Sequence, residues 1–195
     1  MLYVVWWILA YLVGAFPFGL LVAQVFCRLD PRKAGSKNTG ATNIARLCGL
    51  KYGLLVLALD LLKGFLPVFA GYYLSNSPWF LSLTGLASIV GHMYSVYLYG
   101  KGGKGVATTL GVYLALFPLF TCFALLLFAL VIWISGYVSV GSIIFVTTVP
   151  LLLVFSPKIA YVPLTIVVAM LVIFKHRENI ERLIAGTEKS WRKKV

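Results

Sequence analysis

Acidic residues are scarce in this sequence. Asp and Glu together account for only 5 of the 195 residues, namely Asp30, Asp60 and three glutamates near the C-terminus. Enzymes that hold Mg²⁺ through oxygen ligands need several carboxylates around the ion. The shortage of carboxylates therefore argues against a metal site, and against a magnesium-dependent phosphatidyltransferase in particular.

Cysteine is scarce as well. Cys27, Cys48 and Cys122 are odd in number, lie far apart in the sequence and sit in or beside apolar runs. Disulfide frameworks and zinc sites use closely patterned cysteines. We therefore expect neither, and we expect no cofactor.

Charged residues of both signs make up only 11% of the chain, whereas hydrophobic residues make up 61% and the mean hydropathy is +0.96. A soluble core of this size cannot bury so much apolar surface, so the composition predicts an integral membrane protein. The formal net charge is still +12, because Lys and Arg number 17. The polar segments are therefore cationic, and the expected partners are anionic small molecules and lipid rather than nucleic acid.

Several apolar runs have the length of about 20 residues that a helix needs to cross the hydrocarbon layer. The first has no basic segment before it and no small-residue cleavage site after it, so we interpret it as a retained span and not as a signal peptide. The clear runs are residues 3–26, 52–74, 80–99, 137–155 and 159–174.

One further apolar stretch, residues 106–134, is too long for one ordinary span and contains Pro118, which tends to break a helix. If the chain turns near Pro118, the stretch counts as two spans and all three basic clusters lie on one side, as the positive-inside rule requires. The sequence thus predicts an all-α polytopic membrane helix bundle with seven transmembrane helices, the N-terminus outside and the C-terminus cytoplasmic. The clusters are Arg28, Arg32, Lys33, Lys37, Arg46 and Lys51; Lys101 and Lys104; and Lys175, Arg177, Arg182, Lys189, Arg192, Lys193 and Lys194.

The loops on the outer side are short and nearly uncharged, and residues 1–195 are expected to form a single integral membrane domain. No internal repeat is evident, which weakens the inverted-repeat pattern of many secondary transporters. Any chemistry is therefore expected at the cytoplasmic face.

The first polar segment, residues 35–43, combines glycines, hydroxyls and amides, and Arg46 follows about one helical turn later. Such residues favour turns and helix N-termini, where N–H groups face an anion. A polar loop that only caps the next helix is the simpler alternative, but the position of Arg46 favours oxyanion binding.

The second polar segment is Lys101-Gly102-Gly103-Lys104-Gly105. Its glycines can turn consecutive N–H groups into a concave phosphate site, and Lys104 adds a positive charge. The segment is not a Walker A motif, because no Ser or Thr follows the lysine and no strand precedes it. The alternative is a flexible turn that obeys the positive-inside rule.

The third polar segment, residues 175–183, is predicted to continue as a helix out of the last span, with His176 and Asn179 on one face. We expect a site role for His176. For residues 189–194 we prefer a basic tail that contacts anionic lipid headgroups.

Other polar residues lie inside the spans. Asp60 and Lys63 are one turn apart and form either a functional pair or a mutually neutralising one. His92 is expected to be a packing residue. The last pair, Ser139 and Ser142, could reach a phosphate or bond its own backbone.

The three polar segments together resemble the bacterial membrane acyltransferases that use acyl phosphate as donor and glycerol 3-phosphate as acceptor. The family patterns GSGNxGATN, KGGKGVAT and HRENIxRLxxG correspond to residues 35–43, 101–108 and 176–186, in this order and over essentially the whole chain. The sequence departs from the first pattern at Lys37, where the family usually has glycine. This lysine either strengthens anion binding or perturbs the loop.

The resemblance implies that the primary hydroxyl of glycerol 3-phosphate attacks the carbonyl of a long-chain acyl phosphate, which releases phosphate and 1-acyl-glycerol 3-phosphate, the first step of phospholipid synthesis. It places the protein in a bacterial inner membrane, with a soluble acyl-phosphate-forming enzyme as a possible partner. Together with the polar segments it predicts catalytic roles for Ser36, Arg46, Lys104, His176 and Asn179, and substrate binding by Asn38, Thr42, Asn43, Lys101, Gly102, Gly103, Gly105, Ser139, Ser142, Arg177 and Glu178.

Two routes stay open for the hydroxyl proton. His176 could accept it as general base, or a phosphate oxygen of the acyl phosphate could, and we favour the second because no carboxylate in the sequence evidently orients the histidine. A Ser-His-Asp triad of Ser36, His176 and Asp60 is a weaker alternative. The rival functions are a transporter or channel for organic phosphate and a lipid-anchoring scaffold.

Overall fold

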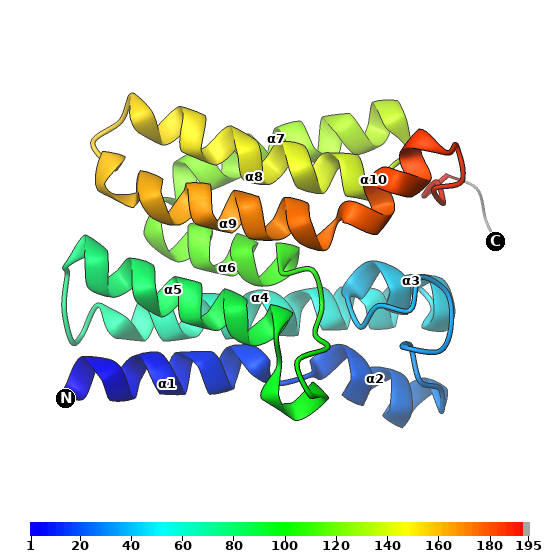
Figure 1. Ribbon diagram of the computed structural model, residues 1–195, viewed down its shortest axis with the longest axis horizontal. Coiled ribbons are helices and arrows are strands. Elements are labelled where there is room, and N and C mark those ends of the chain that lie inside the picture. The colour runs from blue at the N-terminus through cyan, green and yellow to red at the C-terminus, as the bar shows by residue number, and fades with distance from the viewer. Residues whose placement is uncertain (193–195) are drawn as a thin grey trace. The chain divides into compact units, whose positions relative to one another are not determined.

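The computed structural model describes residues 1–192, so Lys193 and Lys194 of the predicted basic tail lie outside it. Within these residues the chain is all-helical, with ten α-helices, two short 3-10 helices and no strand. It divides into two compact units, Met1–Leu116 and Phe117–Val195, and each is described by itself (Figure 1). That the whole chain acts as one domain stays a prediction.

The first unit begins with a broken apolar helix. Helix α1 (Leu2–Ala15) ends just before Pro17, and α2 (Phe18–Cys27) begins just after it, because proline has no N–H to continue the helical hydrogen bonds. The other elements of this unit are α3 (Ala41–Cys48), α4 (Leu50–Gly71), α5 (Pro78–Met93), η1 (Val96–Leu98) and α6 (Val106–Leu116).

Glycines bring the helices of the first unit into backbone contact. A Cβ atom on Gly64 of α4 would collide with the carbonyl of Thr108 on α6, and one on Gly111 of α6 would collide with the carbonyl of Leu61 on α4. The α1·α5 pair meets in the same way, at Gly14 and Gly91. Small residues are what allow close helix packing in a membrane, where apolar side chains gain little by leaving lipid.

The second unit contains α7 (Pro118–Ser135), α8 (Val138–Val154), η2 (Ile159–Tyr161), α9 (Val162–Lys175) and α10 (Arg177–Ile184). Helix α6 ends at Leu116 and α7 begins at Pro118, so the predicted break in the stretch 106–134 is confirmed. Within this unit α8 packs against both α7 and α9.

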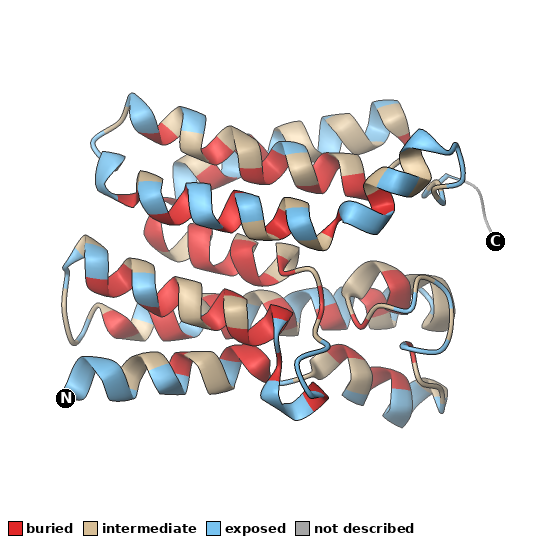
Figure 2. Ribbon diagram, in the orientation of Figure 1, coloured by how far each residue is buried: buried red, intermediate tan, exposed pale blue. Residues whose placement is uncertain are grey.

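Four helical segments are long and apolar enough to cross a membrane: Leu2–Cys27, Leu50–Gly71, Pro78–Leu98 and Pro118–Ser135. The bent pair Ile159–Lys175 and Arg177–Ile184 gives a fifth, and Val106–Leu116 and Val138–Val154 are shorter apolar helices. Figure 2 shows buried and exposed positions alternating along the helices of each unit. Many of the exposed residues are large and apolar, as expected for helices that face lipid. The protein is therefore an all-helical integral membrane protein.

Two expectations are wrong. The structure joins Cys27 and Cys48 in a disulfide, because α2 and α3 pack together with these residues at their last positions. The segment after the last span does not continue straight: α10 is bent by 55° from the preceding helix at His176, whose backbone angles (φ −97°, ψ 4°) are not helical.

Candidate functional site

Asn43 organises the first polar segment, which forms the loop before α3. Its buried side-chain amide accepts a hydrogen bond from the Ser36 N–H at 2.9 Å. The amide nitrogen donates to the carbonyls of Pro31, Ala34 and Asn38, at 3.1, 3.2 and 2.8 Å. One side chain therefore holds the loop, and with it the backbone at Ser36, in a fixed conformation.

The same loop leads directly into α3. The Asn38 side chain accepts the N–H of Gly40, the N-cap residue, at 2.8 Å. Thr42 lies in the first turn of α3 and Arg46 in its last, both half-buried. Lys37 has φ +54°, a left-handed conformation that glycine adopts more easily than lysine.

The glycine-rich turn rests on the end of α5. The Gly103 N–H donates to the His92 carbonyl at 3.1 Å, and a Cβ atom on Gly103 would collide with Nε2 of the His92 ring. Gly105 has φ +85°, a backbone conformation that residues with a side chain rarely adopt, and it faces the Met93 side chain. Its carbonyl accepts the Thr109 N–H at 2.8 Å and so starts α6.

The two lysines of the turn differ in exposure: Lys101 is exposed and Lys104 is half-buried. The turn thus places two cations beside closely packed backbone at the N-terminus of α6. Cations, glycines and a helix N-terminus are the components of a phosphate-binding site.

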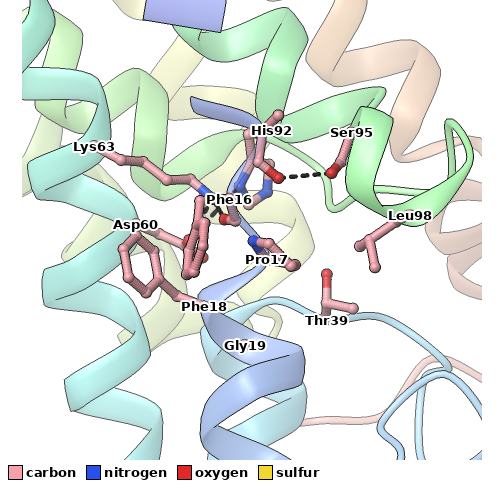
Figure 3. Close-up of a pocket in the computed structure, with 11 residues that line it drawn as sticks. Phe16, Pro17, Phe18, Gly19, Thr39, Asp60, Lys63, His92, Ser95 and Leu98 are labelled. Atoms are coloured by element: carbon pink, nitrogen blue, oxygen red, sulfur yellow. Dashed lines mark hydrogen bonds and ion pairs between the residues drawn. The ribbon is translucent and has the colours of Figure 1, made fainter. Parts of the chain in front are cut away.

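A buried ionic cluster lies behind this turn. The Lys63 ammonium is 2.7 Å from an Asp60 carboxylate oxygen, and both side chains are 3% exposed. The same oxygen is 3.7 Å from Nδ1 of His92, and Lys63 also donates to the Phe16 carbonyl at 2.9 Å. Figure 3 shows these side chains lining a small pocket together with Thr39 of the first polar segment.

In the second unit, His176 is the bend between α9 and α10. The ring is buried, and Nδ1 lies 2.8 Å from the Val172 carbonyl. A carbonyl can only accept, so this contact requires the proton on Nδ1 and leaves the lone pair of the neutral ring on Nε2. The tautomer is the one needed for Nε2 to act as a base.

Glu188, which the sequence did not single out, connects three residues of the second unit. Its Oε1 accepts from Asn179 at 2.6 Å and from Ser139 at 3.0 Å, and its Oε2 accepts from Arg182 at 2.7 Å. Burial would raise the pKa of this carboxyl, but the three hydrogen bonds outweigh it and the pKa is lowered. The position of Glu188 just after the third motif was the one indication in the sequence.

Three predicted residues of the second unit have other partners. Ser142 donates to the Val138 carbonyl of its own helix at 2.8 Å. Arg177 is exposed and stacks on the Phe174 ring, with 4.7 Å from the guanidinium carbon to the ring centroid. Glu178 is exposed and lies 3.9 Å from Arg182.

Each unit thus unites some of the predicted site residues. The first unit joins Ser36, Asn38 and Asn43, and the second joins Ser139 and Asn179 through Glu188. Asp60 is engaged by Lys63 and His92, an arrangement that does not support the triad. Within residues 1–192 no group of three or more His, Cys, Asp and Glu side chains is placed to hold a metal ion.

Apolar spanning helices that carry tightly hydrogen-bonded, cationic polar loops define an integral membrane protein suited to an anionic ligand. The sequence model of the family described as glycerol-3-phosphate acyltransferase matches residues 4–186. The chain belongs to this family and is an acyltransferase of phospholipid synthesis.

Two relatives are similar to this chain over nearly their whole length. The glycerol-3-phosphate acyltransferase of Solidesulfovibrio magneticus is 53% identical, with 95% of this chain and 94% of the relative covered. That of Lawsonia intracellularis is 48% identical, with 96% and 95% covered.

Two solved structures are also similar to this chain. One is the crystal structure of PlsY (YgiH), an integral membrane glycerol 3-phosphate acyltransferase, in its glycerol 3-phosphate form. It has a TM-score of 0.93 and 41% sequence identity to this chain, and the match covers 97% of this chain and 96% of the PlsY chain. Its lysophosphatidic acid form has a TM-score of 0.90 and 40% identity, with 97% and 95% covered.

Proposed function

We propose that this protein transfers the acyl group of a long-chain acyl phosphate to the primary hydroxyl of glycerol 3-phosphate. The products are 1-acyl-glycerol 3-phosphate and inorganic phosphate. The main support is the likeness to PlsY, which was crystallised in a glycerol 3-phosphate form and a lysophosphatidic acid form. These two molecules are the acceptor and the acylated product of the proposed reaction.

The acyl phosphate donor is supported by the second polar segment. We assign its phosphate to the turn formed by Gly102, Gly103 and Gly105, with Lys101 at the edge and Lys104 opposite the leaving phosphate. The negative charge on that phosphate grows as the acyl–oxygen bond breaks, so a fixed cation and N–H groups stabilise the transition state more than the ground state.

The acceptor is assigned to the first and third polar segments. We infer that Ser36, Asn38, Arg46, His176 and Asn179 bind glycerol 3-phosphate and orient its hydroxyl toward the acyl carbonyl. Their support is the match to the family motifs and, in the first segment, the loop that Asn43 holds in place. Ser139, Ser142, Thr42, Arg177 and Glu178 stay predictions of substrate contact.

The hydroxyl proton leaves as the new ester bond forms. It passes either to Nε2 of His176 or to an oxygen of the donor phosphate. The variant His176→Gln distinguishes the two routes. Turnover that survives with an unchanged pH–rate profile would exclude histidine as the base. Loss of the part of the pH–rate profile that reflects titration of a histidine would support it.

We also propose seven spans, with the N-terminus outside, the C-terminus in the cytoplasm and the active site at the cytoplasmic face of a bacterial inner membrane. The four long apolar segments, the bent pair and the two shorter apolar helices add up to seven apolar segments. A single cysteine at position 76 or at position 101 of a cysteine-free variant tests this topology. An impermeant maleimide added to intact spheroplasts should label position 76 and not position 101.

The decisive experiment is acyl transfer by the purified protein in lipid. Glycerol 3-phosphate is supplied with palmitoyl phosphate in one reaction and palmitoyl-coenzyme A in the other. Lysophosphatidate and phosphate formed only from palmitoyl phosphate would support the proposal. Product formed only from palmitoyl-coenzyme A would refute acyl phosphate as the donor. No product from either donor would favour the alternative function, transport of organic phosphate. Uptake of glycerol 3-phosphate into liposomes that contain the protein would then measure that transport. A soluble enzyme that forms acyl phosphate is the expected supplier.

A further inference from the structure

The buried cluster of Asp60, Lys63 and His92 has no part in the reaction described above. It lies within the first unit and joins three elements: α4, which carries Asp60 and Lys63; the end of α5, which carries His92; and the break between α1 and α2 at Phe16. Buried charges are costly unless they are paired, and in a membrane they are functional candidates.

We propose that Asp60, Lys63 and His92 are positioning residues that fix the conformation of the glycine-rich turn for phosphate binding. This inference rests on the proposed function, because it assumes that the turn receives a substrate phosphate. In this proposal the cluster acts through the turn and not by contact with the substrate.

The first step of the argument is the contact between His92 and Gly103. The His92 carbonyl accepts the Gly103 N–H at 3.1 Å, and the ring occupies the space that a Cβ atom on Gly103 would need. Both the backbone and the side chain of one residue therefore define where the turn lies. The His92 ring must therefore keep one orientation for its contact with Gly103 to stay the same.

The second step is the environment of the ring. Nδ1 of His92 lies 3.7 Å from an Asp60 carboxylate oxygen, which is longer than a hydrogen bond and within ion-pair range for a protonated ring, and the His92 side chain is 7% exposed. Asp60 is itself held by Lys63, and Lys63 is held by the Phe16 carbonyl. Pro17 breaks the helix at this point, and Lys63 gives the Phe16 carbonyl a donor from another helix. The turn is thus connected to the break in the first helix through three residues, His92, Asp60 and Lys63.

Neighbouring glycines provide a matched test. A Cβ atom on Gly103 would collide with the His92 ring, whereas one on Gly102 would collide with the backbone carbonyl of His92. Shortening the histidine side chain therefore makes room at Gly103 and none at Gly102. We expect Gly103→Ala, Gly102→Ala and His92→Ser each to raise the KM for a phosphate-bearing substrate more than they lower kcat.

The double variants decide the matter. His92→Ser combined with Gly103→Ala should have a KM about tenfold below the product of the two single effects, which is typical of residues in contact. In the double variant of His92→Ser and Gly102→Ala, the KM should equal the product of the two single effects. Multiplicative effects in both pairs would overturn the proposal, as would a lower melting temperature with unchanged KM in every His92 variant.

A second variant tests the ion pair without leaving one buried charge alone. Asp60→Asn combined with Lys63→Met removes both charges together. If the pair positions the turn, KM rises severalfold and kcat changes less; if it only ties helices together, the melting temperature falls and KM stays the same. The second result would overturn the role of the pair.

Failure of the proposed function gives a different pattern. The KM is measured for both substrates, and a rise confined to glycerol 3-phosphate supports the positioning role while refuting the assignment of the donor to the turn. If the wild-type protein transfers no acyl group, the same variants are compared by calorimetric binding of glycerol 3-phosphate and of inorganic phosphate. Loss of the non-additivity for both ligands would overturn the positioning role as well.

Discussion

Replacing Glu188 by Ala should destabilise the second unit. The side chain is 8% exposed and accepts three hydrogen bonds, from Asn179, Ser139 and Arg182. Hydrogen bonds to a charged group contribute about 1.5–3 kcal/mol each, and the half-exposed Arg182 lies at the low end of that range. Because such effects are not additive within one network, we expect a total loss of about 3–5 kcal/mol.

The assay is thermal unfolding of the purified protein in detergent. For a chain of this size, 1 kcal/mol corresponds to about 2–4 °C, so the melting temperature should fall by roughly 6 °C or more. Glu178→Ala is the matched control, because Glu178 is exposed and pairs with the same Arg182 at 3.9 Å, a contact that contributes about 0.5 kcal/mol or less. Equal melting temperatures for the two variants would refute the reasoning.

Three further predictions concern stability. The Glu188 contribution should be complete above the ordinary carboxyl pKa of 4.5 and be lost as the pH falls from there through the lowered pKa of the folded state, because a carboxyl with a lowered pKa stabilises only while ionised. The melting temperatures of the wild type and of Glu188→Gln should therefore stay apart from pH 7 to about pH 5 and converge only as the pH is lowered further. Lys37→Gly should raise stability by about 0.5–1 kcal/mol by relieving the left-handed backbone at φ +54°, and an unchanged or lower melting temperature would contradict this. Reducing the Cys27–Cys48 disulfide should cost about 3 kcal/mol, as for a closed loop of this length, and Cys27→Ser should melt at that lower temperature with or without reductant.

Local rules explain what could be predicted from the sequence. Hydropathy indicated membrane spans, Pro118 marked the break between α6 and α7, and the spacing of three residues put Asp60 and Lys63 in contact. Each of these features depends on neighbouring residues within one or two helical turns. The three family motifs are also short contiguous segments, and they indicated the enzyme class.

Contacts between distant residues explain what was missed. Cys27 and Cys48 meet only because the loop between them folds back so that α3 packs on α2. Glu188 reaches Ser139, 49 positions earlier, which no spacing rule shows. The bend at His176 follows from its backbone angles and from the bond of its ring to Val172, whereas the residue pattern alone is compatible with a straight helix.

The glycine contacts between α4 and α6 limit how this protein can adapt to a different bilayer. An interface made of backbone atoms has no side chains to exchange, so it cannot be adjusted by substitution when the membrane becomes thicker or thinner. Substitution is easier on the exposed side of α4, where Leu54, Leu66 and Phe69 are about half exposed. Changes that match the protein to lipid composition should therefore accumulate at such positions, while the backbone contacts at Gly64 and Gly111 stay as they are.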